Sequence, residues 1–197
     1  MGDEYFKNKY RVASTRLTDW DYSKEGFYFV TICTKDRKCN LGEVKNNNIY
    51  LSEIGKIVLE EWLNTPKLRP NVFLDDFIIM PNHIHGILVI KDDPTVVETH
   101  CNASLQFTKN TFGPQRRNLS SINRGFKGAV KRECNKNNLS DFEWQPRYYE
   151  HIIKNDEDYA RIKEYIAHNP INWELDRNNP INIGRSPQSE AEDEKYL

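Results

Sequence analysis

Runs of β-branched and aromatic residues, separated by short polar segments, predict strands in the first half of the chain. GFYFVTICT at residues 26–34 is bounded by a glycine and the polar KDRK, which is typical of a buried strand. NVFLDDFIIM at residues 71–80 and HIHGILVI at residues 83–90 predict two more strands, separated by the turn pair Pro81–Asn82. LGEVKNNNIYLS predicts a hairpin or edge strand that turns at Lys45–Asn48, because asparagine tolerates left-handed backbone angles.

Helical spacing of apolar residues predicts two helices, one before and one after the strands at residues 71–80 and 83–90. The first begins at Ser52 as N-cap and ends at Pro66. Its apolar positions are Ile54, Ile57, Val58, Trp62 and Leu63. The second is basic and amphipathic, is capped by Ser120 or Ser121, and runs to about Asn135. Its inward positions are Ile122, Phe126, Ala129, Val130 and Cys134.

The last part of the chain predicts one more extended segment and one more helix. YYEHII at residues 148–153 favours a strand, and Asn155 caps a helix whose first turn is acidic, which suits its positive end. Pro170 ends this helix. The order strand, hairpin, helix, strand, strand predicts an α+β protein, in which an antiparallel sheet has helices packed mainly on one face.

The length of 197 residues fits one domain, which we expect at residues 1–177. The polar stretch 91–118 has the length of a functional or flexible insertion, and residues 178–197 form a polar, acidic tail. Hydrophobic residues make up 38% and charged residues 29%, which is a soluble profile. No window approaches the roughly 18 consecutive apolar residues of a membrane span, and the N-terminus lacks the apolar centre of a secretory signal.

We therefore expect a cytoplasmic protein without a membrane partner. The four cysteines show no CxxC pair, so we expect free thiols in a reducing compartment at Cys33, Cys39, Cys101 and Cys134.

The net charge of −1 hides a local basic stripe. Between residues 115 and 136 only Glu133 is acidic, whereas the basic residues are Arg116, Arg117, Arg124, Lys127, Lys131, Arg132 and Lys136. Arg124, Lys127 and Lys131 are spaced i, i+3 and i+7, so they share one helix face. A stripe of this kind suits a phosphate backbone. A solvated helix face explains it equally well.

Two histidines stand one residue apart in the strand HIHGILVI. Positions i and i+2 of a strand point to the same face, so His83 and His85 present two ring nitrogens side by side. This pair can grip a metal ion or a phosphate. Alternatively, both rings are satisfied by neighbours on the sheet. A zinc site normally needs three or four protein ligands, so a metal site requires a further group from elsewhere.

The last helix offers such a group. Tyr165 and Asn169 are one turn apart and about 40° apart around the helix axis. An amide oxygen with two imidazoles suits Mg²⁺ or Mn²⁺ with positions left for substrate oxygens, and Tyr165 would stand beside it as a nucleophile. His168 is an alternative third ligand, but it lies about 60° from Tyr165 on the more exposed side. Tyr165 is otherwise a boundary tyrosine, and Tyr159 belongs to the core.

Three separated blocks of the sequence resemble the REP-associated tyrosine transposases, which belong to the HUH superfamily of nucleases. REP stands for repetitive extragenic palindrome. The blocks cover roughly residues 10–177, with the stretch 91–118 poorly matched, and they read DYSKEGFYFVTICTKDR with LRPNVFLDDF, MPNHIHGILVI, and WQPRYYEHIIKNDEDYARIKEYIAHNPINWELD.

The resemblance implies a ferredoxin-like or RRM-like core, the HUH nuclease fold. His83 and His85 match the histidine pair, Tyr165 matches the nucleophile, and Asn169 matches the residue that completes the metal site. Relatives cut and rejoin one strand of DNA, often at REP hairpins, through a 5′-phosphotyrosine intermediate and a divalent metal, Mg²⁺ or Mn²⁺. They act as monomers or homodimers. The resemblance therefore implies that this protein acts on bacterial DNA in the nucleoid, as a monomer or a homodimer.

DNA contacts outside this site are predicted from the basic stripe and, for the N-terminal segment, from the resemblance. The basic residues expected to follow the DNA backbone are Arg116, Arg117, Arg124, Lys127 and Lys131, while the N-terminal segment through Arg16 is expected to contact bases near the foot of the hairpin.

Two other functions fit the same residues. A sheet with exposed aromatics and a basic helix can bind single-stranded nucleic acid without chemistry, although the chain lacks the RNP1 pattern of an RNA-reading RRM. A metal-dependent phosphodiesterase would use the same histidines to activate water and would not need Tyr165.

Overall fold

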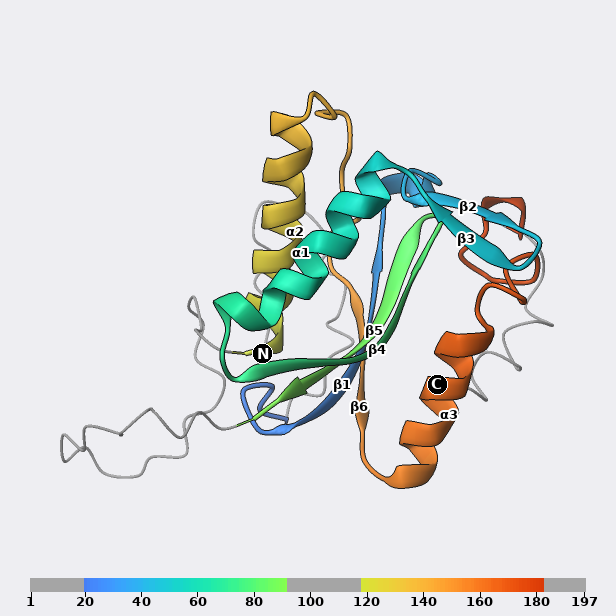
Figure 1. The fold of residues 1–197 in the computed structure, drawn as a ribbon. Helices are drawn as coiled ribbons and strands as arrows, with labels where there is room; N and C mark the ends of the chain where they lie inside the picture. Colours follow the sequence, from blue (N-terminus) through green and yellow to red (C-terminus); the bar gives the residue numbers. More distant parts are fainter. Residues whose placement is uncertain (1–19, 92–117, 183–197) are drawn as a thin grey trace, which may run out of the picture.

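The computed structural model describes residues 20–91 and 118–182 and contains a four-stranded antiparallel sheet (Figure 1). The strand order is β4-β5-β1-β6, formed by β1 (Gly26–Cys33), β4 (Val72–Met80), β5 (His83–Ile90) and β6 (Tyr149–Ile153). A separate hairpin consists of β2 (Gly42–Lys45) and β3 (Asn48–Leu51), and the helices are α1 (Glu53–Leu68), α2 (Leu119–Lys136) and α3 (Asp156–His168). Short 3₁₀ turns are η2 (Lys35–Arg37) and η3 (Pro180–Asn182).

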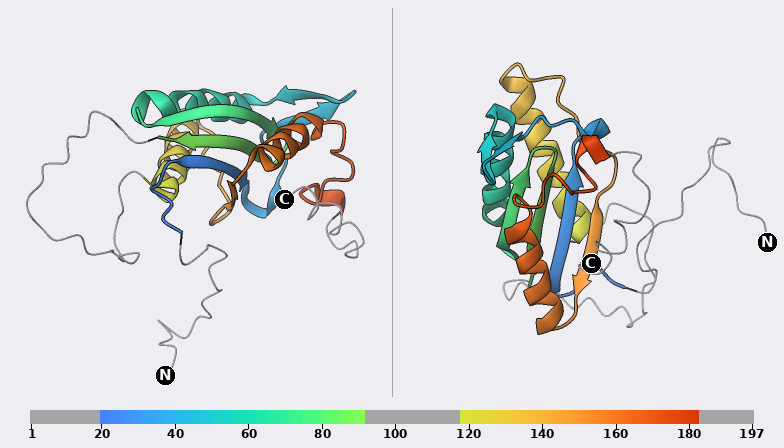
Figure 2. Two further views of the ribbon diagram at one scale, coloured as in Figure 1. Left: turned by 90° about the horizontal axis from the view of Figure 1, so that it is seen from below. Right: turned by 90° about the vertical axis from the view of Figure 1, so that its right-hand side faces the viewer.

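The helices lie on both faces of the sheet, two on one side and one on the other. Helices α1 and α2 contact each other and cover one face, whereas α3 packs against the opposite face (Figures 1 and 2). Without the β2-β3 hairpin and α3, the order β1-α1-β4-β5-α2-β6 is that of a ferredoxin-like fold. The predicted α+β class, with helices mainly on one face, is confirmed.

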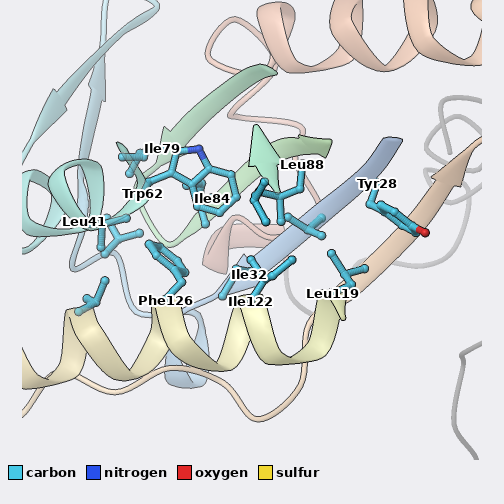
Figure 3. Packing of buried hydrophobic residues seen from close by; sticks show 14 of the residues in the cluster. Tyr28, Ile32, Leu41, Trp62, Ile79, Ile84, Leu88, Leu119, Ile122 and Phe126 are labelled. Carbon is cyan, nitrogen blue, oxygen red and sulfur yellow. The ribbon is translucent and has the colours of Figure 1, made fainter. Parts of the chain in front are cut away.

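The main core lies between the sheet and helices α1 and α2. Trp62 and Phe126, one from each helix, meet edge to face with ring centroids 5.1 Å apart, above Ile84 of β5 (Figure 3). Gly86 is required below them, because a Cβ at this position would lie 2.5 Å from the Trp62 ring. A smaller cluster on the other face joins Phe29 of β1 to Ile162 of α3.

The predicted strands and the hairpin are confirmed, and the turn has the expected asparagines. Asn46 and Asn47 adopt positive φ angles of 50° and 61°. Ser52 caps α1 by accepting a bond from the Gly55 N–H, and Asn155 caps α3 in the same way. Each cap satisfies a backbone donor that the first helical turn leaves without a partner.

Three details of the predicted helices were wrong. Helix α1 continues past Pro66 to Leu68, so the proline lies inside the last turn and only two helical residues follow it. Leu63 is 48% exposed, since it lies about 100° around the axis from the buried Trp62. Helix α2 is capped by Asn118, whose side chain accepts from the Ser121 N–H, so Ser121 belongs to the first turn.

Asn178 and Asn179, which directly follow the boundary predicted at residue 177, are buried. The predicted insertion falls almost entirely outside the described residues, as do residues 183–197 of the predicted tail. Three cysteines, Cys33, Cys39 and Cys134, are free as expected, and Cys101 lies outside the described ranges. None of the described helices has the length and apolar character needed to cross a membrane.

Candidate metal and tyrosine site

His83 and His85 lie on the face of β5 that α3 covers, and both are buried. Their ring centroids are 4.4 Å apart, so the two imidazoles form one cluster as the strand spacing predicts. His85 pairs in register with Thr31 of β1, whose hydroxyl oxygen lies 2.8 Å from His85 Nδ1. Phe29 stacks on the His85 ring with centroids 5.3 Å apart, which fixes the plane of that ring.

The two rings direct their Nε2 atoms away from these polar neighbours. His83 Nδ1 lies 2.8 Å from Asn82 Oδ1, so Nε2 is the nitrogen left for another partner. This Nε2 atom is buried and has no hydrogen-bond partner among the described residues. Because a buried polar atom without a partner is costly, its presence suggests a ligand.

Tyr165 and Asn169 reach the same place from α3. The Tyr165 hydroxyl lies 3.3 Å from His85 Nε2, and the two ring centroids are 5.1 Å apart. Asn169, at the C-terminal end of the helix, is buried, and its Oδ1 lacks a hydrogen-bond partner in the described ranges. The structure therefore brings together the four residues that the sequence singled out.

Asp176 is a further member of the site that the sequence analysis missed. Its Oδ2 atom is buried, lies 3.6 Å from His83 Nε2, and has no hydrogen-bond partner in the part of the chain that the structure describes. His83, His85 and Asp176 each offer one ligand atom, and these three atoms lie within 4.8 Å of one another. Asp176 follows α3 in an irregular segment, so no helical or strand spacing connects it to the histidines.

Burial controls protonation in this cluster. Burial lowers the pKa of His83 to about 3, although the neighbouring Asn169 side chain opposes the shift. Burial also lowers the pKa of His85 well below its ordinary value, and the adjacent His83 adds to this effect. Burial raises the pKa of the Asp176 carboxyl. Both imidazoles are therefore neutral near pH 7, which is the form that binds metals.

The donor atoms fit a divalent metal ion. They comprise two imidazole nitrogens, one carboxylate oxygen and one amide oxygen, and three of them are buried without hydrogen-bond partners in the described segments. Such a mixed set suits Mg²⁺ or Mn²⁺ as well as zinc. A cation here would satisfy the lone pairs that the fold leaves buried.

The remaining predicted site residues lie elsewhere. His168 is exposed beside Glu164, with 3.8 Å between its Nδ1 and a carboxylate oxygen, so it is not part of the cluster. Arg124 is exposed on α2, which covers the opposite face of the sheet. Lys127 and Lys131 donate from Nζ to backbone carbonyls in the segment 140–147 that follows α2. Arg16, Arg116 and Arg117 lie outside the described residues.

Two other tyrosines near Tyr165 in sequence point away from the histidines. Tyr159 packs edge to face on Phe27 and its hydroxyl donates to Asp75 at 2.5 Å, so it lies at the border of the smaller cluster. The Tyr148 hydroxyl lies 3.3 Å from Ser120 of α2. Tyr165 is the tyrosine on α3 that contacts the histidine pair.

The chain is similar in sequence to several known proteins. No protein-family profile matches the sequence. The chain is 40% identical over 180 residues to an uncharacterized protein of Haemophilus influenzae, covering 90% of this chain and 98% of that one. It is 23% identical over 150 residues to a REP-associated tyrosine transposase of Escherichia coli, covering 76% and 69%.

A solved structure supports the fold. The structure of a REP-associated tyrosine transposase bound to a REP hairpin superposes with a TM-score of 0.56 at 22% identity, over 82% of this chain and 74% of that chain.

Proposed function

Because the chain belongs to the family of REP-associated tyrosine transposases, we propose that it cuts and rejoins single-stranded DNA with Tyr165 as the nucleophile. The observation that carries this proposal is the Tyr165 hydroxyl, 3.3 Å from His85 Nε2 at the edge of a buried cluster of metal-ligand type. The relative that was solved with a REP hairpin makes hairpin DNA the first substrate to test.

His83, His85 and Asp176 would hold the divalent metal, with Asn169 as a fourth donor. The donor atoms would be Asp176 Oδ2, Asn169 Oδ1 and Nε2 of each histidine, because the two Nδ1 atoms already face Asn82 and Thr31. When bound, Mg²⁺ or Mn²⁺ acts as a Lewis acid that stabilises charge growing on the oxygens of the scissile phosphate. Compared with the sequence prediction, Asp176 adds a negative charge that two imidazoles and an amide do not supply.

Tyr165 carries the covalent step. Its oxygen forms a bond to phosphorus while the bond from phosphorus to the 3′ oxygen breaks, which gives a 5′-phosphotyrosine and a free 3′-hydroxyl. A phenol with an ordinary pKa of about 10 must lose its proton to react well. His85 Nε2 lies 3.3 Å from this hydroxyl, but its lone pair would be on the metal, so the proton would pass to solvent and a divalent cation held there would favour the ionised phenolate. Rejoining reverses the step, so the bond energy is kept and no ATP is needed.

The surroundings of Tyr165 keep it in place. Phe29 contacts the Tyr165 ring edge to face with centroids 6.1 Å apart and also stacks on His85. Ile162, in the turn before Tyr165, and Ile166, directly after it, anchor the helix on the sheet. This packing holds the hydroxyl at the cluster before substrate arrives, which lowers the entropic cost of the reaction.

DNA contacts outside the cluster are part of the proposal. The exposed Arg124, with Arg116 and Arg117, would contact phosphates, and the N-terminal segment through Arg16 would contact bases near the foot of the hairpin, as the resemblance implies. Lys127 and Lys131 are expected to contribute less, because their ammonium groups already bind backbone carbonyls. We propose that the protein works in the bacterial cytoplasm on nucleoid DNA, as a monomer or a homodimer.

The test is adduct formation on end-labelled, single-stranded hairpin DNA with Mn²⁺, analysed on denaturing gels. Wild type and Tyr159→Phe are expected to form a denaturant-resistant protein–DNA adduct, whereas Tyr165→Phe forms none. Tyr159 is the matched control because it lies on the same helix and also packs on the sheet. Cleavage without adduct that persists in Tyr165→Phe would show a water-activating phosphodiesterase. Binding without cleavage by wild type would show a nucleic-acid-binding module.

A further inference from the structure

Asn82 lies in the turn between β4 and β5, directly before the first histidine, and its side chain is fully buried. Its amide nitrogen donates to two backbone carbonyls, Arg37 O at 2.9 Å and Asn178 O at 2.7 Å. Its Oδ1 lies 2.8 Å from His83 Nδ1. One side chain therefore uses three hydrogen bonds to join the turn η2, the segment after α3 and the histidine pair.

These contacts determine which nitrogen of His83 carries the proton. A backbone carbonyl only accepts, so the Asn82 NH₂ group must face Arg37 and Asn178. The other end of the amide is then the oxygen, which also only accepts. His83 Nδ1 must donate to it, so in the neutral ring Nδ1 bears the hydrogen and Nε2 bears the lone pair. That lone pair is the one that faces Asp176.

The same amide holds the segment that supplies Asp176. Asn178, whose carbonyl accepts from Asn82, also donates its backbone N–H to Asp176 Oδ1 at 2.6 Å. This bond leaves Asp176 Oδ2 for the cluster. The path from Asn82 through Asn178 to Asp176 is buried or partly buried throughout, so water competes little for its hydrogen bonds.

We infer that Asn82 is a positioning residue for the metal site, with two separable effects. It sets the tautomer of His83 so that Nε2 is a ligand, and it ties the segment of Asp176 to the cluster. The inference rests on the metal role given under Proposed function. It does not require that DNA be cut, since both effects precede substrate binding. Outer partners of metal-bound histidines typically change metal affinity about 10–100-fold when they are replaced.

The first test needs no variant of Asn82. Nitrogen NMR of ¹⁵N-labelled, chelator-treated full-length protein reports which imidazole nitrogen carries hydrogen, and His83→Gln assigns the signal. The expected result is a neutral His83 with hydrogen on Nδ1 near pH 7. A ring with hydrogen on Nε2 in the wild type would overturn the inference.

Two variants separate the two effects. In Asn82→Asp, a carboxylate still accepts from His83 Nδ1 but cannot donate to Arg37 O and Asn178 O. We expect the same tautomer as wild type and Mn²⁺ binding about 10-fold weaker by calorimetry. In Asn82→Ala, both effects are lost, so the His83 signals should show mixed tautomers and the Mn²⁺ affinity should fall further.

Asn123→Ala is the matched control, because Asn123 is a buried asparagine on α2 on the other side of the sheet. The inference is overturned if Asn82→Ala keeps the wild-type tautomer and binds Mn²⁺ as tightly as Asn123→Ala does. It is also overturned if the wild type does not bind Mn²⁺. Intact Mn²⁺ binding that depends on Asn82, without any DNA adduct, would support this inference while contradicting the proposed reaction.

Discussion

The two faces of strand β5 are formed by alternate residues of the same strand but differ in chemistry, because one is apolar and the other carries two histidines. On the face toward α1 and α2, Ile84, Leu88 and Ile90 are apolar and fully buried in the main core. On the face toward α3, His83 and His85 are equally buried but leave nitrogen atoms aimed at other polar groups. Burial alone therefore does not distinguish the site from the core.

The number of unpartnered acceptor atoms that lie together makes the distinction. On the core side, the buried atoms without hydrogen-bond partners include the indole N–H groups of Trp62 and Trp144, which are donors and cannot bind a cation, and the amide of Asn123, which supplies a single acceptor oxygen. On the α3 side, the corresponding atoms of His83, Asp176 and Asn169 carry lone pairs. Leaving such groups unpaired costs about 1–3 kcal/mol each. Three acceptors that converge are the feature that suggests a metal.

The largest expected effect on stability comes from the core face. Ile84→Ala should lower the free energy of unfolding by about 2–5 kcal/mol, because it leaves a cavity under Trp62 and Phe126. Mn²⁺ affinity of the remaining folded protein should stay at the wild-type value, since Ile84 points away from the histidines. Urea unfolding and calorimetry measure the two quantities. A loss of Mn²⁺ affinity in this variant would show that the two faces are not independent.

The α3 face should make stability depend on pH. The pKa of His83 is lowered from 6.5 to about 3, so between these values the unfolded chain binds a proton that the folded chain does not. Stability of the metal-free protein therefore falls as pH drops below 6.5, by at most about 1.4 kcal/mol per pH unit from this group. The free energy of unfolding, measured between pH 7 and pH 4, should depend less on pH in His83→Gln than in the wild type. Equal slopes in both proteins would contradict the burial of this imidazole.

Asp176→Asn should affect the metal-free and metal-bound protein in opposite directions. Burial raises the pKa of Asp176, so the ionised carboxylate lowers stability near pH 7 when no cation is present. The amide should leave the melting temperature without Mn²⁺ unchanged or higher, and weaken Mn²⁺ binding about 10-fold. Asp141→Asn, an exposed acid, is the control. Unchanged Mn²⁺ affinity in Asp176→Asn would remove this residue from the site.

The smallest expected effect comes from removing the N-caps of α1 and α3, which cover opposite faces of the sheet. Ser52→Ala on α1 and Asn155→Ala on α3 should each cost about 1 kcal/mol of stability, because each side chain caps the first turn of its helix. Adduct formation should persist in both variants at temperatures well below unfolding. If only Asn155→Ala loses adduct formation, then the position of Tyr165 depends on the far end of α3.

Periodic parts of the molecule were predictable from sequence, and irregular parts were not. The alternation in HIHGILVI placed both histidines on one face, and helical spacing placed Tyr165 one turn before Asn169. Asp176 has no such spacing, because the segment after Pro170 is held by contacts to Asn82 and to its own backbone. Long side chains were equally unpredictable: Lys127 reaches carbonyls of a segment whose path no local pattern specifies.

The late position of Asp176 in the chain determines when the candidate site is completed during synthesis. A ribosome that has released α2 has already produced both histidines and most of the sheet, but neither Tyr165 nor Asp176. Since domains fold as their segments emerge, the core between α1, α2 and the sheet can form before the cluster is complete. An unfinished chain that ends before α3 therefore cannot carry out the proposed cleavage, because it lacks both the proposed nucleophile Tyr165 and the carboxylate of Asp176.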